Sequence, residues 1–237
     1  MSGKLTLAQR GELPWRVWRE ALEFSEKLAE SDRVRSRRFK AFTVASLILA
    51  FVSGLVWQFG PFQAVFAVAS LSDPKKLATL GERAANPRLN KIVYWLHFAE
   101  TRGLPAGMAV GLAQWMNWTR EPRASLVEES LMRNLKIADG LGLLTKENKA
   151  RLRNGKAGVI TRGPYADSNA EVDHIVPYSL APEAGNELAN LELMPQELNR
   201  RKSNRVGERQ LAHAEKLFSA GLITRESLNR VKARLGK

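Results

Sequence analysis

The residues best able to do chemistry lie together between 171 and 205, in the segment EVDHIVPYSLAPEAGNELANLELMPQELNRRKSNR. Asp173 and His174 come first, and a basic run with Asn199 and Lys202 comes last. Phosphodiester hydrolysis needs an activated water, neutralised phosphate charge and help for the departing oxygen. Histidine suits the first task because its pKa lies near neutrality, while carboxylate and amide oxygens suit Mg²⁺ and basic side chains suit phosphate. The segment is therefore typical of a site that cleaves phosphodiesters.

The pattern around these side chains predicts the order strand, loop, strand, helix. Residues 172–176 are apolar and β-branched outside the Asp-His pair, and a proline ends them. After a turn-rich loop, a second strand is expected over 190–194 and a helix over 196–204. Neighbours on an ideal strand point to opposite faces, so Asp173 and His174 can share one phosphate only if the strand twists or ends there.

The motifs DHIVP, NLELM and NRRKS, in this order, resemble those of the HNH (ββα-metal) endonucleases. The likeness covers residues 164–205. It is nearest to the Asp-His/Asn/Asn type seen in the HNH domains of CRISPR RNA-guided nucleases and in phage Holliday-junction resolvases. It implies a ββα-metal fold, a divalent metal ion and 5′-phosphate products. The motifs of residues 1–150 indicate no family.

The resemblance also implies roles for single residues. His174 matches the general base, and Asp173 and Asn199 match the metal ligands. Asn190 matches the asparagine that ties the connecting loop to the base-bearing strand, and Lys202 matches a lysine that can contact phosphate; with His174, both are counted as candidate catalytic residues. Candidate nucleic-acid contacts are Arg200, Arg201, Lys202 and Arg205. Glu171 is either an acid that supports the metal ligands or a solvent-facing residue.

Composition limits the alternatives. The absence of cysteine excludes disulfides, iron–sulfur clusters, cysteine nucleophiles and thiolate zinc sites. Because the last motif residue is Asn199 rather than histidine, Mg²⁺ or Mn²⁺ is expected in preference to Zn²⁺ or Ni²⁺. The net charge of +13 favours a polyanionic partner, either nucleic acid or an anionic membrane surface. His213 is expected to be a surface or packing residue.

The whole chain is predicted to be mainly α with a small α+β module. A charged amphipathic helix is expected over 1–40, a transmembrane or buried apolar helix over 41–60, and further helices over 61–153. The HNH nuclease domain, followed by C-terminal helices, is expected over 154–237.

The apolar segment predicts a single membrane span. Residues 41–72 carry no charge, and AFTVASLILAFVSGLVWQF is close to the ~20 residues of a spanning helix. The basic run RVRSRRFK before it, and Trp57 and Phe59 at its end, match the flanks of such a helix. Gly60 and Pro61 would end it. Membrane association is therefore expected, or a cytoplasmic protein if 41–72 is buried core instead.

The sequence thus predicts a Mg²⁺- or Mn²⁺-dependent HNH endonuclease that acts on nucleic acid, with DNA the expected substrate, and membrane anchoring through 41–60. One alternative is a membrane-tethered nucleic-acid-binding protein whose HNH module is inactive. It would show strongly salt-dependent binding without cleavage. Another is a soluble nuclease whose apolar segment lies in a core.

Overall fold

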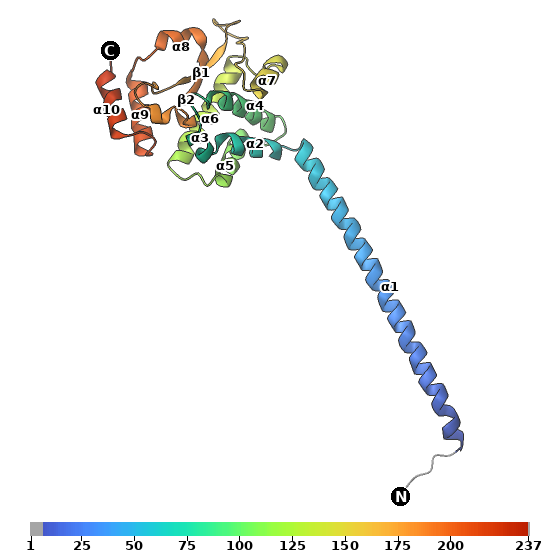
Figure 1. Cartoon of the computed structure of the whole chain (residues 1–237). Coiled ribbons are helices and arrows are strands. Elements are labelled where there is room, and N and C mark those ends of the chain that lie inside the picture. Colours follow the sequence, from blue (N-terminus) through green and yellow to red (C-terminus); the bar gives the residue numbers. More distant parts are fainter. Residues whose placement is uncertain (1–6, 237) are drawn as a thin grey trace. The chain divides into compact units, whose positions relative to one another are not determined.

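The computed structural model describes residues 7–236 and consists mainly of helices with one small sheet (Figure 1). Side chains are described everywhere in this range except at 7–18, 21, 29, 32–34, 37, 38 and 55–59. The chain divides into two compact units, Met1–Val56 and Trp57–Lys237.

The first unit contains most of one long helix, α1 (Leu7–Phe59). The charged and apolar segments that were predicted as separate helices form one continuous helix. Neither glycine nor proline lies between residues 15 and 53 to interrupt it. As expected, the helix ends before Gly60 and Pro61.

The predicted membrane span over 41–60 is wrong. Among the described residues, no helix is long and apolar enough to cross a membrane. The buried-core alternative holds for only part of 41–72: Ala64, Val65 and Val68 are buried, whereas Phe42 is 72% exposed and Ile48 is 58% exposed. Membrane anchoring, and the localisation inferred from it, are therefore unsupported.

The second unit begins with a group of packed helices. They are α2 (Phe62–Ser72), α3 (Pro74–Ala78), α4 (Asn86–Glu100), α5 (Ala106–Met116), α6 (Arg123–Gly140) and α7 (Lys146–Arg153). α4 is central, because it packs against α2, α5, α6 and α7. Its apolar residues recur at helical spacing, and Leu89, Ile92 and Leu96 are completely buried. Burial of each such side chain contributes about 2 kcal/mol.

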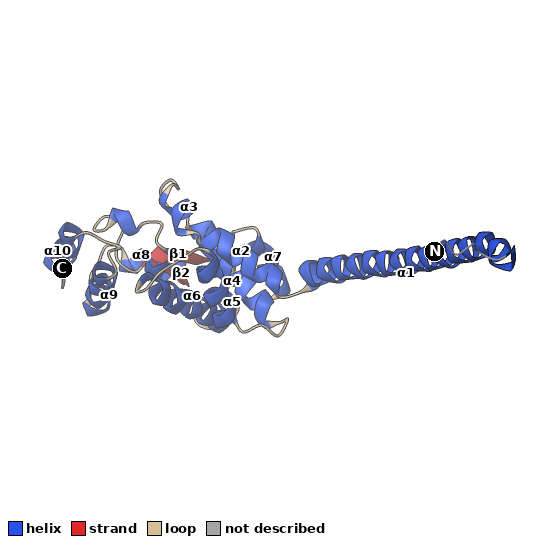
Figure 2. Cartoon of the chain, turned by 90° about the horizontal axis from the view of Figure 1, so that it is seen from below, coloured by secondary structure: helices blue, strands red, loops and turns tan. Residues whose placement is uncertain are grey.

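The sheet has two antiparallel strands, β1 (Ala170–His174) and β2 (Leu191–Pro195), which Figure 2 shows among the helices of this unit. Asp173 lies opposite Glu192, and His174 lies opposite Leu191. The connecting loop contains two short 3₁₀ turns, η1 (Pro182–Ala184) and η2 (Leu188–Asn190). The helices α8 (Gln196–Lys202), α9 (Glu208–Ser219) and α10 (Arg225–Arg234) follow. The predicted order of strand, loop, strand and helix is therefore present.

The helical region supports the sheet directly. On α6, the Asn134 side chain donates to the carbonyl of Leu191 at 2.9 Å and accepts from the amide of Leu193 at 2.7 Å. Ser130 donates to the carbonyl of Leu188 at 2.8 Å. Two-stranded sheets are marginally stable alone. Asn134 thus takes the place of a third strand at the edge of β2, and both regions share one hydrophobic core.

Candidate functional site

Three of the predicted site residues, Asp173, His174 and Asn199, meet at a cleft between β1, α8 and the start of α4. The cleft has a volume of about 480 Å³. Its walls include four residues of the HNH segment, Glu171, Asp173, His174 and Asn199. They also include three polar residues of the helical region, Arg83, Asn86 and Asn90.

His174 is held in one orientation by the loop that follows it. Its ring is 6% exposed, and its Nε2 lies 2.8 Å from the carbonyl oxygen of Gly185. A carbonyl only accepts hydrogen bonds, so Nε2 carries the proton and Nδ1 keeps a free lone pair. Gly185 must be glycine here, because a Cβ would lie 2.6 Å from the ring of Tyr178.

The surroundings of His174 favour its neutral form. Burial is the main cause that lowers its pKa below the ordinary 6.5, and the positive charges of Arg83 and Lys202 act in the same direction. The hydrogen bond to Gly185 and the charge of Asp173 oppose the shift without cancelling it. At neutral pH the ring is therefore a neutral imidazole that can accept a proton.

Asn190 ties the loop to the end of β1, as the resemblance implies. Its Oδ1 accepts from the amide of Val176 at 2.8 Å, and its Nδ2 donates to the carbonyl of the same residue at 3.1 Å. The side chain is fully buried. This geometry gives Asn190 a positioning role and leaves it no access to a substrate.

Asp173 and Lys202 form an ion pair on the other side of β1. The Lys202 ammonium, on the last turn of α8, donates both to the Asp173 carboxylate and to the carbonyl of His174. Their side chains are 17% and 16% exposed. Lys202, which was expected to contact phosphate, is thus paired with Asp173, the carboxylate expected to bind the metal.

Glu171 and Asn199 form a second pair between β1 and α8. The Asn199 Nδ2 donates to the Glu171 carboxylate at 2.9 Å. A carboxylate accepts only, so the amide nitrogen must face Glu171 and the amide oxygen turns away from it. Glu171 and Asp173 are two residues apart on β1 and share a face. Glu171 is half-buried and bonded to Asn199 rather than simply facing solvent.

The cleft fits a hard divalent ion better than a soft one. Asp173 and Asn199 offer oxygen atoms, which Mg²⁺ and Mn²⁺ prefer. In the described part of the chain, no three His, Cys, Asp or Glu side chains gather as a metal site. An ion would therefore need the Asn199 amide oxygen and several waters. Among the described residues, the buried amide oxygens of Asn86 and Asn90 also lack hydrogen-bond partners.

The remaining candidates lie outside the cleft. Three arginines are exposed on α8 and just after it: Arg200, Arg201 and Arg205. His213, on α9, lies 3.0 Å from the carbonyl of Ala189, and burial is the main cause that lowers its pKa to about 4. It is a packing residue, one of the two readings expected.

The sequence did not reveal several residues that complete the site. Gly185 orients His174, and Asn186 beside it bonds to the loop of residues 80–85. Arg83, Asn86 and Asn90 supply the opposite wall. The turn-forming residues before η2 were visible in the sequence. Nothing local marks the contacts of Asn186 with residues more than a hundred positions earlier.

Residues 160–207 match the family model described as HNH endonuclease. This segment contains both strands, α8 and the HNH residues that line the cleft, and it confirms the resemblance to this family over the same part of the chain. Neither the comparison with curated proteins nor that with solved structures finds a match. The segment carries the family's nuclease signature, which points to chemistry on nucleic acid.

Proposed function

We propose that this protein is a divalent-metal-dependent HNH endonuclease that hydrolyses phosphodiester bonds, with DNA as the expected substrate. The observation that carries the proposal is the orientation of His174. Within the HNH segment, the carbonyl of Gly185 accepts the hydrogen bond from Nε2 of His174, so Nδ1 is the basic atom of the ring. The same cleft is lined by Asp173 and Asn199.

His174 would act as the general base. Its lowered pKa keeps Nδ1 unprotonated at neutral pH, so it can remove a proton from the attacking water. Asn190 holds the strand end that carries the ring, since it bonds both backbone groups of Val176. The base therefore needs no rearrangement before reaction.

Asp173 and Asn199 would hold the ion through their side-chain oxygens, with water as further ligands. When bound, a divalent ion neutralises charge that develops on the phosphate and on the leaving 3′ oxygen. Glu171 fixes the Asn199 amide with its oxygen turned away from the Glu171 carboxylate. Lys202 must leave Asp173 for this arrangement, and its released ammonium can then contact a substrate phosphate.

The positive surface around the cleft would retain the substrate. Arg200, Arg201 and Arg205 are exposed beside it, and the chain carries a net charge of +13. Phosphate contacts of this kind give binding that weakens steeply with salt.

Cleavage of supercoiled plasmid in the presence of Mg²⁺ tests the proposal. Wild-type protein should nick or linearise the plasmid, and EDTA should stop the reaction. His174→Ala should cleave far more slowly, whereas His213→Ala, which alters a half-buried histidine on a backbone carbonyl, should remain active. Cleavage by His174→Ala at the wild-type rate would exclude His174 as the base. Salt-dependent DNA binding without cleavage under any divalent ion would instead favour an inactive binding module.

A further inference from the structure

The helical region outside the HNH match contributes its own basic residue to the cleft. Arg83 precedes α4 and lies far from the segment 160–207 in sequence, yet it lines the same cleft as Asp173 and His174. We propose that Arg83 binds a phosphate of the substrate strand beside the cleaved bond. This inference rests on the proposed nuclease function and adds a substrate-binding residue to it.

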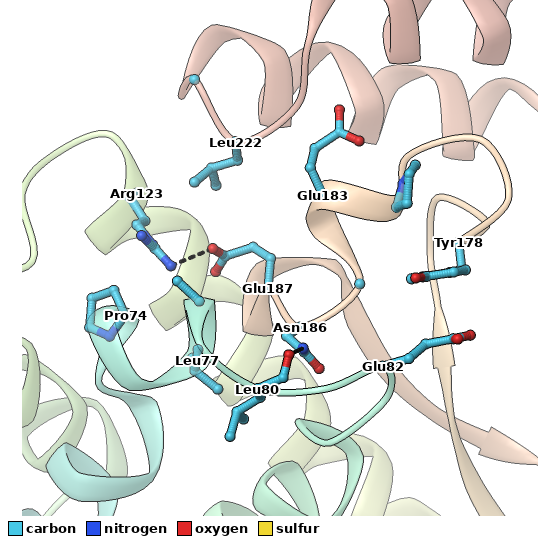
Figure 3. A pocket seen from close by; sticks show the side chains of 14 residues that line it. Pro74, Leu77, Leu80, Glu82, Arg123, Tyr178, Glu183, Asn186, Glu187 and Leu222 are labelled. Carbon is cyan, nitrogen blue, oxygen red and sulfur yellow. Dashed lines mark hydrogen bonds and ion pairs between the residues drawn. The ribbon is translucent and has the colours of Figure 1, made fainter.

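The loop that carries Arg83 is fixed to the catalytic loop by one side chain. The Asn186 Oδ1 accepts from the amide of Ala85 at 3.1 Å. Its Nδ2 donates to the carbonyls of Leu80 and Gly81, at 3.2 and 2.9 Å. Figure 3 shows Asn186 beside Leu80. Asn186 directly follows Gly185, so the orientation of His174 and the placement of Arg83 depend on adjacent residues.

The other end of this loop is attached to β1. Asn86, the first residue of α4, donates to the carbonyl of Val172 at 3.4 Å. The loop is therefore held at both ends by the HNH segment. Arg83 lies between these two attachments and is presented at the cleft.

The backbone at Arg83 is strained in a way that packing does not explain. Its φ is +60°, in the left-handed region that favours glycine and asparagine. The side chain is 66% exposed and pairs only with its neighbour Glu82, at 3.6 Å, among the contacts of the described residues. An exposed pair of this kind contributes little to stability. An arginine at this strained position is better explained by a ligand than by the fold.

The two carboxylates of the cleft also favour a cation at the position of Arg83. Glu171 and Asp173 would repel an approaching phosphate backbone. A guanidinium can hold two phosphate oxygens at once, which fixes the strand as well as attracting it.

Equilibrium binding of a short fluorescein-labelled DNA duplex tests the inference. His174→Ala serves as the background, so that the probe stays intact. In it, Arg83→Gly should weaken binding about threefold to tenfold and reduce the slope of log K against log salt by about one. Glycine is chosen because it relieves the strained backbone, so thermal stability should be kept or increased.

Arg162→Ala is the matched control. The Arg162 side chain is also 66% exposed and pairs with an acid, Asp139, at 3.9 Å, but it lines a different cavity. Its removal should leave both affinity and salt slope nearly unchanged. Asn186→Ala should weaken binding as Arg83→Gly does, and the double variant should be no weaker than either one. That non-additivity would show that Asn186 acts through Arg83.

Two results would overturn the inference. In the first, Arg83→Gly binds the duplex with the affinity and salt dependence of Arg162→Ala while wild-type protein still cleaves plasmid, which removes the role of Arg83 and leaves the nuclease function intact. No binding by wild-type protein would remove both. If wild-type protein binds without cleaving, and Arg83→Gly binds more weakly, the phosphate contact stands and the nuclease function fails.

Discussion

The two faces of β1 are built differently, although both border one cleft. On one face, His174 is buried and bonds to the backbone carbonyl of Gly185. Asn190 supports this face through the backbone of Val176. On the other, Asp173 is paired with a side chain, the flexible Lys202. The first face is held by backbone partners, whereas the second is held by a side chain.

This difference suggests a division of labour. A base must be oriented before water arrives, and backbone partners provide that rigidity. Carboxylates that bind an ion must exchange one partner for another, and a lysine on a flexible stem can leave. The face that carries His174 should therefore behave as a fixed face, and the face that carries Asp173 as an exchangeable face.

The largest effect is expected on the fixed face, from removing the base. His174→Ala should lower the cleavage rate by about 10²- to 10⁴-fold, because a positioned general base contributes that much. Single-turnover cleavage of a labelled duplex measures it, with His213→Ala as the control. A loss of less than about tenfold would mean that the fixed face does not carry the base.

Asn190→Ala should destabilise the protein by about 2 kcal/mol, because it leaves buried backbone groups of Val176 without partners. Urea unfolding measures the free energy of unfolding. Asn154→Ala is the control, because Asn154 is exposed and bonds only a carbonyl of its own helix, that of Ala150. If both variants unfold at the same urea concentration, the fixed face is not rigidly supported.

On the exchangeable face, Lys202→Met should tighten Mn²⁺ binding by about threefold to tenfold, since the ion no longer competes with an ammonium for Asp173. Titration calorimetry on the folded protein measures the affinity. Lys216→Met, which removes a lysine paired with Glu129 at 3.3 Å, should have no effect. Weaker ion binding by Lys202→Met would show that this lysine supports the site rather than competing for it.

The smallest effect concerns pH. Burial places the folded-state pKa of His174 below its ordinary 6.5, so protonation favours the unfolded state, where the pKa is higher. The stability from the neutral ring is present above pH 6.5 and is lost as the pH falls toward the folded pKa. The acid limb of the pH–rate profile should therefore have its midpoint below 6.5. Arg83→Gly should move this midpoint upward, because it removes a positive charge; a downward shift would contradict the assignment.

Sequence patterns predicted the local parts of the site well. Pro177 after the Asp-His pair and the apolar run near Leu191 located both strands to within about two residues, because strand signals are local. β1 ends at His174, and Asp173 and His174 line one cleft, which the sequence allowed if the strand ended there. The bonds of Asn186 to residues 80–85 could not be predicted, since contacts between distant segments leave no local pattern.

The membrane prediction failed for a related reason. The uncharged composition of 41–60 predicts a span, whereas the structure continues the charged helix into this segment as α1, and no helix of the described residues is long and apolar enough to cross a membrane. A run of apolar residues gives no information about where the helix that contains it begins. The length of the run and its flanking charges therefore did not distinguish a separate spanning helix from part of a longer one.

The hydrogen bonds from Asn134 to β2 have a consequence for how far the chain around the HNH segment could be shortened. The segment that carries the family match, 160–207, lacks α6 and therefore lacks the group that completes its sheet. A fragment restricted to residues 154–237 would expose Leu191 and Leu193, both now buried, along an open strand edge. The family match is thus confined to a short segment, whereas the sheet of that segment is completed by a helix outside it.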